Sequence, residues 1–112
     1  MASSDLISKT CTPCEGGTLP LNDEQVAQLL PQIEGWTLTD DGCIERLFRF
    51  DNYYETMAFV NASAWLSHQQ DHHPDLVVGY GQCRVSYITH AIDGLSENDF
   101  ICAAKVSRLI QS

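Results

Sequence analysis

Three of the four histidines lie in one short stretch, Ser67-His68-Gln69-Gln70-Asp71-His72-His73-Pro74, and the fourth is His90. Histidine is the side chain whose ordinary pKa, about 6.5, lets it take up and release protons near neutral pH. The residue types in this stretch therefore predict general acid/base chemistry on a bound substrate.

Each of these residues also has a purely structural explanation. His72 and His73 precede Pro74 and could simply end a helix, because a cationic histidine near a helix C-terminus offsets the helix dipole. A single histidine such as His90 is more often a satisfied surface residue, and Tyr80 is explained by packing. The set of residues, rather than any one of them, favours a site.

A long helix must position the histidine stretch. Asn52, with Glu55 three residues later, has the pattern of a capping box and predicts the helix start. Pro74 disfavours helical torsions in the residue before it, so the helix must end near the histidines. Residues at helical spacing predict the buried stripe of this helix: Tyr54, Met57, Ala58, Asn61, Trp65 and His68. We expect this stripe to lead into a half-buried histidine cluster.

His90 is expected at the end of a strand. Residues 76–80 and 83–90 flank a Gly-Gln turn and predict a hairpin. A last helix follows, with Ser96 as its N-cap and Asp99 at the third helical position. This capping role is a structural explanation for Asp99.

The remaining patterns complete an α-β-β-α-β-β-α order. Asn22 caps a first helix that extends to about Ile33, and residues 36–50 predict a hairpin around a turn at 40–42. Hairpins imply antiparallel pairing, and amphipathic helices must bury their apolar faces. The sequence therefore predicts an α+β domain, a four-stranded antiparallel sheet with three helices packed on one face.

The chain is short and acidic, with 112 residues and a formal net charge of −9. Its length suits a single domain. Its charge argues against binding to nucleic acid or to an anionic membrane surface. No apolar run approaches the roughly 20 residues needed to span a bilayer. With no secretory signal and an odd number of scattered cysteines, we expect reduced thiols and a cytoplasmic location.

Residues 1–20 are expected to be a flexible leader or a packing strap, followed by a single domain at residues 21–112. The leader contains the motif Cys11-Thr12-Pro13-Cys14, which lacks the second ligand pair of a zinc knuckle. It also lacks the strand–helix context of a thioredoxin-type motif. We expect that removing residues 1–18 leaves the fold and the activity largely intact.

The spaced set of polar residues resembles the signature of pterin-4a-carbinolamine dehydratases. The matching residues are Asp71-His72-His73-Pro74, Tyr80, His90 and Asp99. The resemblance includes the passage from Leu29 to Trp36 and the strand Phe48-Arg49-Phe50, and it covers about residues 20 to 110. The chain has His68 where some relatives carry Glu, and Leu76 where some carry an aromatic residue.

The resemblance implies dehydration of 4a-hydroxytetrahydropterin to quinonoid dihydropterin, a hydro-lyase reaction of tetrahydropterin recycling, with no metal or organic cofactor. It places His72 and His90 as the acid/base pair, with His73 binding and polarising the pterin. Substrate-binding or orienting roles are expected for four further residues: Asp71, His68, Pro74 and Asp99. It also implies a homodimer or homotetramer, with an aromatic amino-acid hydroxylase pathway as one expected context.

The chemistry of this reaction suits imidazoles. Loss of water from a carbinolamine needs one proton delivered to the departing hydroxyl and another removed from a ring nitrogen. A neutral imidazole accepts at one nitrogen and donates at the other. Each positioned acid or base typically contributes about 10²–10⁴-fold.

Two other kinds of function remain open. His68 and His72 are four residues apart, and such a pair on a helix can chelate zinc or copper. Alternatively, the domain could be a protein-binding module, because some animal members of the dehydratase family act as dimerisation cofactors for a transcription factor. No residue of this chain identifies such a partner.

Overall fold

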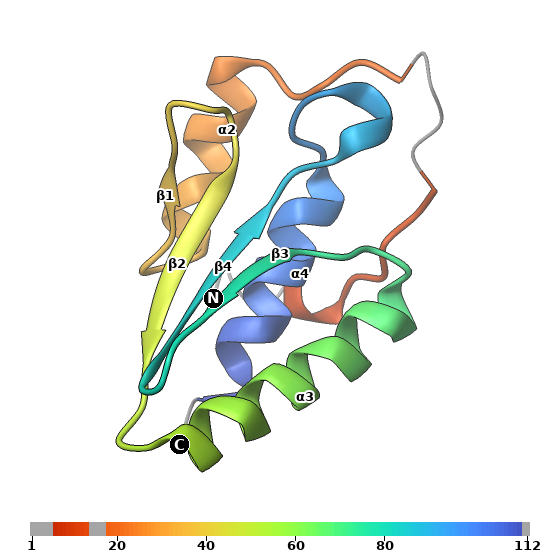
Figure 1. Cartoon of the computed structure of the whole chain (residues 1–112). Helices are drawn as coiled ribbons and strands as arrows, with labels where there is room; N and C mark the ends of the chain where they lie inside the picture. Colours follow the sequence, from red (N-terminus) through yellow and green to blue (C-terminus); the bar gives the residue numbers. More distant parts are fainter. Residues whose placement is uncertain (1–5, 14–17, 111–112) are drawn as a thin grey trace.

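The computed structural model describes residues 6–13 and 18–110 (Figure 1), and the predicted order of helices and strands is confirmed. The main helices are α2 (Asp23–Leu29), α3 (Tyr53–Gln70) and α4 (Glu97–Arg108), and residues 6–8 are also helical. The strands are β1 (Thr37–Leu38), β2 (Ile44–Arg49), β3 (Asp75–Val78) and β4 (Gln82–Tyr87). Short 3-10 turns follow α2 at Leu30–Gln32 and β4 at His90–Ile92. Among the described residues, no helix is both long enough and apolar enough to cross a membrane.

The four strands form one antiparallel sheet in the order β1-β2-β4-β3. The register pairs Phe48 of β2 with Cys83 of β4, and Leu76 of β3 with Val85 of β4. Alternate residues of β2 and β4 are buried, and they define one covered face: Ile44, Phe48, Cys83, Val85 and Tyr87. The α+β class and the single four-stranded sheet are therefore confirmed.

The capping signals at the two shorter helices are confirmed. Asn22 and Gln25 exchange side-chain-to-backbone hydrogen bonds at the start of α2. Ser96 and Asp99 form the same reciprocal arrangement at the start of α4. Each box satisfies backbone N–H groups that have no partner within the helix.

The stripe predicted to bury α3 faces solvent instead. Tyr54 is 83 % exposed and Trp65 is 63 % exposed. The buried positions of the helix are Thr56, Phe59, Ser63 and Ser67. A prediction from hydrophobicity chooses the wrong face of α3, because three of the four residues that are buried are small and polar. The Thr56 hydroxyl donates to a backbone carbonyl of its own helix, as does that of Ser63, which offsets the cost of burial.

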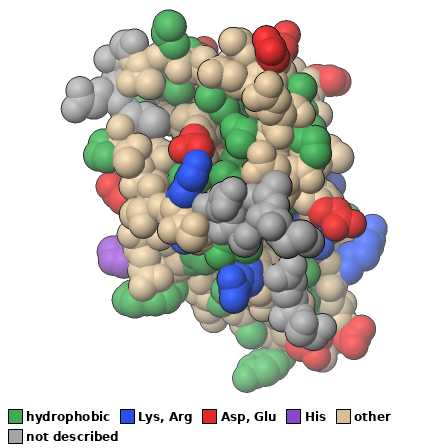
Figure 2. Space-filling model, turned by 180° about the vertical axis from the view of Figure 1, so that it is seen from behind, with side chains coloured by type: hydrophobic (Ala, Val, Ile, Leu, Met, Phe, Trp, Pro, Cys, Tyr) green, Lys and Arg blue, Asp and Glu red, His purple; other side chains and the backbone are tan. Residues whose placement is uncertain are grey.

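Phe59 is the one large apolar residue among the buried positions of α3. Its ring centroid lies 4.6 Å from that of Phe48 and 5.2 Å from that of Phe50. These ring contacts join the start of α3 to the end of β2. Hydrophobic side chains are left on the surface elsewhere, and Figure 2 shows several of them projecting at the edges of the face opposite to the view of Figure 1.

Residues 6–13 of the leader form a packing strap and not a flexible arm. We call this segment the strap. Leu6 is 1 % exposed and belongs to the core. The Lys105 ammonium of α4 donates to the Ile7 carbonyl at 2.7 Å, and Lys9 forms an ion pair with Glu97 at 2.8 Å. The strap is therefore attached to α4 by both apolar and polar contacts. Cys14, the second cysteine of the predicted motif, lies outside the described residues.

The burial of Leu6 predicts that the strap contributes to stability. We expect Leu6→Ala to lower the free energy of unfolding by about 2–5 kcal/mol, because it removes buried methyl groups and leaves a cavity. Leu19 is 85 % exposed, so Leu19→Ala is the matched control and should change the stability little. Urea denaturation of both variants measures the difference. Equal stability of the two variants would show that the strap does not pack as described.

Candidate active site

The histidine stretch leaves α3 through a left-handed residue. Asp71 has φ 52° and ψ 41°, a conformation that aspartate tolerates better than most residues. Its N–H donates to the His68 carbonyl, and the His72 N–H donates to the Ser67 carbonyl, which closes the end of the helix. The chain then turns toward β3. His72 is therefore directed away from the helix axis that carries His68.

His72 is held by a buried carboxylate and an aromatic ring. Its Nε2 atom lies 2.6 Å from Oδ1 of Asp99, a residue with no exposed surface. Its ring stacks on that of Tyr87, with centroids 5.7 Å apart and an interplanar angle of 7°. The His72 side chain is only 12 % exposed. Its position and orientation are thus fixed before any ligand binds.

Asp99 serves both as a helix cap and as the partner of His72. Its Oδ2 atom accepts hydrogen bonds from the Thr89 hydroxyl at 2.8 Å and from the Ser96 backbone N–H at 2.9 Å. Its Oδ1 atom faces the histidine. The structural explanation offered by the sequence is therefore correct, and the same carboxylate also orients an imidazole.

The surroundings of His72 change its pKa in opposing directions. Burial lowers the pKa, because a cation is disfavoured away from water. The hydrogen bond to Asp99 and the charge of that carboxylate raise it, with smaller contributions from Cys11 and Asp71. The net result is a pKa above the ordinary histidine value, so more of the His72 ring is protonated at neutral pH.

His90 does not end a strand. β4 stops at Tyr87, and His90 begins a 3-10 turn that continues to Ile92. The turn closes because Asp93 adopts a left-handed conformation, with φ 51°, and its N–H donates to the His90 carbonyl. This corrects the strand prediction, but His90 still lies at the same end of β4 as His72.

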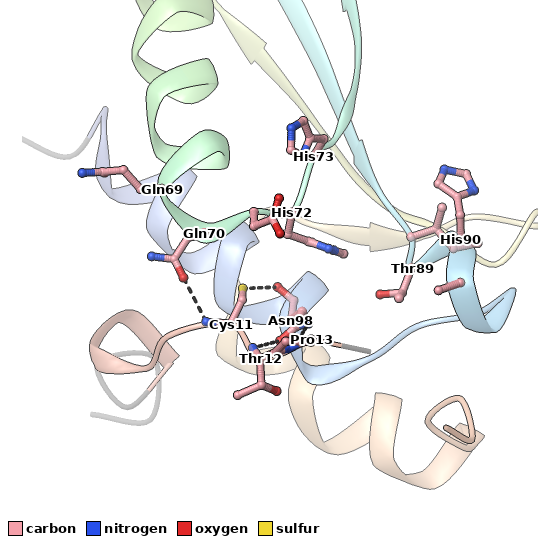
Figure 3. A pocket seen from close by; sticks show the side chains of 13 residues that line it. Cys11, Thr12, Pro13, Gln69, Gln70, His72, His73, Thr89, His90 and Asn98 are labelled. Carbon is pink, nitrogen blue, oxygen red and sulfur yellow. Dashed lines mark hydrogen bonds between the residues drawn. The ribbon is translucent and has the colours of Figure 1, made fainter. Parts of the chain in front are cut away.

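The structure brings His72, His73 and His90 to one pocket of about 520 Å³. Figure 3 shows the three rings around this hollow, two from the exit of α3 and one from the turn after β4. The further lining residues are Cys11, Thr12, Pro13, Gln69, Gln70, Asp71, Ile88, Thr89, Ala91 and Asn98. The sequence spacing therefore identified histidines that converge in space.

The strap forms one wall of this pocket, which the sequence did not indicate. The Cys11 N–H donates to Oε1 of Gln70 at 2.9 Å. Thr12 and Asn98 exchange two hydrogen bonds, at 3.0 Å and 2.5 Å. Figure 3 shows these contacts joining the strap to α4 and to the end of α3. These contacts argue against the expectation that residues 1–18 can be removed without effect, and no sequence signal pointed to them, because the context of the cysteine motif indicated no role.

Three of the predicted orienting residues do not line the pocket. His68 is exposed on α3 and lies beside Trp65, with ring centroids 5.8 Å apart. Pro74 is partly buried and leads into β3, and Asp99 lies beneath His72. Within residues 6–13 and 18–110, no three His, Cys, Asp or Glu side chains gather as a metal-binding group. The chelate prediction assumed that His68 and His72 lie on one helix, but α3 ends at Gln70, between them.

The sequence matches the family model described as "Pterin 4 alpha carbinolamine dehydratase" over residues 19–109. The chain belongs to this family. A relative from Nitrosomonas eutropha, named "Putative pterin-4-alpha-carbinolamine dehydratase", is 64 % identical over 109 residues, which is 96 % of each chain. A relative of the same name from Legionella pneumophila is 56 % identical and covers 96 % of this chain and 97 % of its own.

Two solved structures share the fold. One is a crystal structure described as a transcriptional coactivator/pterin dehydratase from Brucella melitensis, with a TM-score of 0.79 and 26 % identity, covering 82 % of this chain and 99 % of the other. The second is a pterin dehydratase-like protein identified as a RuBisCO assembly factor in the alpha-carboxysome. Its TM-score is 0.61 and its identity is 25 %, over 70 % of this chain and 93 % of the other. This dehydratase fold is thus found in proteins described by different functions.

The contact between His72 and Asp99 predicts a titration that NMR can follow. In Asp99→Asn, burial still lowers the pKa of His72 while the opposing carboxylate charge is gone. We expect the pKa of His72 to fall from above the ordinary value to below it. Asp75→Asn removes an exposed carboxylate on β3 and is the matched control. An unchanged His72 pKa in Asp99→Asn would refute the contact.

The same shift has a consequence for stability. Because the folded-state pKa of His72 is raised, protonation of His72 stabilises the fold. This contribution is fully present below the ordinary pKa, near 6.5, and is lost as the pH rises through the folded value. The stability difference between the wild type and Asp99→Asn should therefore be largest in mild acid and shrink with rising pH.

Proposed function

We propose that this protein dehydrates 4a-hydroxytetrahydropterin (pterin-4a-carbinolamine) to quinonoid dihydropterin by histidine acid/base catalysis, as a step of tetrahydropterin recycling in the cytoplasm. The observation that carries the proposal is the convergence of His72, His73 and His90 on one pocket, with His72 held by buried Asp99. Membership of the dehydratase family supports the substrate class.

The proposed roles follow from the environment of each histidine. His72 has a raised pKa, so more of its ring carries a proton at neutral pH, and we assign to it the delivery of a proton to the departing hydroxyl. Its Nε2 atom is engaged with Asp99, which assigns this transfer to Nδ1. His90, in the turn that follows β4, takes the proton from a ring nitrogen of the pterin. His73, exposed at the pocket margin, binds and polarises the pterin.

The pocket suits a ligand of this size and polarity. Its volume, about 520 Å³, is in the range of sites that hold small organic molecules. The Gln69 amide lies among the lining residues and is of the kind that bonds the polar edge of a bicyclic pterin, whereas the Thr89 hydroxyl and the Asn98 amide are already bonded to Asp99 and Thr12. The lone pair of a pterin nitrogen assists departure of the hydroxyl, so the chemistry is one of proton transfer.

Alanine variants test the three roles. We expect His72→Ala and His90→Ala each to lower kcat by about 10²-fold or more, toward the spontaneous background. The double variant should lose far more than either single variant, unless the two rings act as one unit and the effects are non-additive. His73→Ala should raise KM as well as lower kcat. The assay follows quinonoid product by absorbance with freshly generated carbinolamine.

His68→Ala is the matched control for this series. His68 precedes the site by only a few residues but is exposed and does not line the pocket. The His68→Ala variant should catalyse the reaction at close to the wild-type rate. Wild-type rates for folded His72→Ala and His90→Ala would reject the catalytic assignment, whereas equal losses in His68→Ala and His72→Ala would point to a general structural effect.

A second candidate function is protein binding, and the exposed stripe of α3 is the observation that favours it. Tyr54 and Trp65 are large, exposed and on the predicted stripe. The described coactivator and assembly-factor roles of the two solved relatives give this candidate a precedent. The occupant we propose is a second copy of this chain, in keeping with the homodimer or homotetramer expected from the sequence.

The oligomeric state tests this surface separately from catalysis. We expect light scattering to give a multiple of the 12.5 kDa chain mass. Replacing Tyr54 and Trp65 with glutamate should dissociate the assembly, because a charge is costly to bury at an apolar contact. Thr37→Glu, at an exposed position of β1, is the control. A wild-type monomer, or an assembly indifferent to the α3 variants, would exclude this role for the stripe.

A further inference from the structure

Two thiols from distant parts of the chain touch beside the histidine pocket. The Sγ atoms of Cys11, in the strap, and Cys102, in α4, lie 3.5 Å apart, although the residues are separated by 91 positions. Cys102 is fully buried, and Cys11 is partly exposed and lines the pocket. Cys11 is therefore accessible to a small solute, whereas Cys102 is shielded from solvent behind it.

Hydrogen bonds from the strap to Gln70 and Asn98 hold the two thiols next to each other. The Cys11 N–H donates to Gln70 Oε1, and the Cys11 thiol lies 3.6 Å from the Asn98 carbonyl oxygen. The next residue, Thr12, is bonded twice to the Asn98 side chain. Cys102 follows Asn98 by one helical turn, so both residues present the same side of α4 to the strap. Neither thiol has to travel far to meet the other.

The two thiols differ in acidity. The pKa of Cys11 is lowered, chiefly because its sulfur accepts a hydrogen bond from Cys102, and the charges of His72 and Lys105 act in the same direction against burial. The pKa of Cys102 is raised by the same hydrogen bond and by burial. Since the thiolate is the reactive form, Cys11 is the sulfur that an oxidant attacks first.

We propose that Cys11 and Cys102 are a peroxide-sensitive thiol pair that closes to a reversible disulfide, joining the strap to α4 at the wall of the histidine pocket. The Cys11 thiolate attacks hydrogen peroxide, the O–O bond breaks, and hydroxide leaves as Cys11 becomes a sulfenic acid. The Cys102 sulfur then attacks the Cys11 sulfur, and the sulfenic hydroxyl leaves with the thiol proton as water. Peroxide is reduced by two electrons, and a dithiol reductant reverses the change.

The disulfide would convert a hydrogen-bonded pocket wall into a covalent one. It would close a loop of about 90 residues, and long loops give large stabilisation by restricting the unfolded chain. The strap would then remain against α4 when its hydrogen bonds open. The pairing does not depend on the dehydratase reaction, so it can be tested without pterin.

The test is peptide mapping of the wild-type chain after mild hydrogen peroxide treatment. We expect a peptide pair linking Cys11 to Cys102, protection of both from alkylation, and a loss of about 2 Da that dithiothreitol reverses. We also expect the melting temperature to rise by about 5 °C or more on oxidation, as a long cross-linked loop predicts. Non-reducing gels separate this product from intermolecular dimers.

Variants of three cysteines distinguish the pair from general oxidation. Cys102→Ala should form no cross-link and show no rise in melting temperature, while Cys11 accumulates as a sulfenic acid that dimedone traps. Cys11→Ala should leave Cys102 reduced, which provides the same answer if Cys102→Ala fails to fold. Cys43→Ala, a matched control on the far hairpin, should cross-link as the wild type does.

Three results would overturn the proposal. The first is a disulfide between Cys11 and Cys14, the neighbour in the sequence motif. The second is continued alkylation of Cys102 in oxidised wild-type protein. The third is oxidation of Cys43 or Cys83 at the same rate as Cys11, which would show that the contact with Cys102 confers no special reactivity.

Discussion

Asp99 is a buried carboxylate that joins three segments: the start of its own helix, the chain that leaves β4, and the more distant exit of α3. Its oxygens accept from the Ser96 backbone N–H and the Thr89 hydroxyl, and one of them contacts the His72 ring. A buried charge is stable only when its hydrogen bonds are satisfied, so the segments must meet at this point. The start of α4, the exit of β4 and the exit of α3 are thereby fixed together. The pocket opens where those three segments converge.

The helix that precedes the histidines, α3, packs through a face that is mostly small and polar. α3 buries the small polar residues Thr56, Ser63 and Ser67 along with Phe59, and it leaves large aromatic residues outside. Small side chains allow the helix to lie close to the sheet, and the Thr56 hydroxyl also donates to the Tyr80 carbonyl at 2.9 Å. The exposed aromatic residues are then available for the proposed interface. One face of α3 packs in the fold, and the other is open to a partner.

The strap links the pocket to the rest of the fold. Leu6 is buried in the core, while Cys11 and its neighbours reach the pocket wall a few residues later. The chain thus closes one side of its own site with a segment that precedes the first strand. This arrangement gives the wall two kinds of attachment, apolar packing at one end and hydrogen bonds to Gln70 and Asn98 at the other.

The sequence alone determined the element order and the helix caps, because these depend on local signals such as turn residues and capping boxes. It also singled out the three histidines that line the pocket, through the set of polar residues and the family resemblance. The tertiary structure decided which face of α3 is buried, since buried hydroxyls satisfied by carbonyls leave no hydrophobic signal. It also decided that His68 stays outside the pocket on the exposed face of α3, while the left-handed torsion of Asp71 turns the chain so that His72 reaches Asp99. The strap and the pairing of Cys11 with Cys102 rest on contacts across most of the chain, which no local pattern encodes.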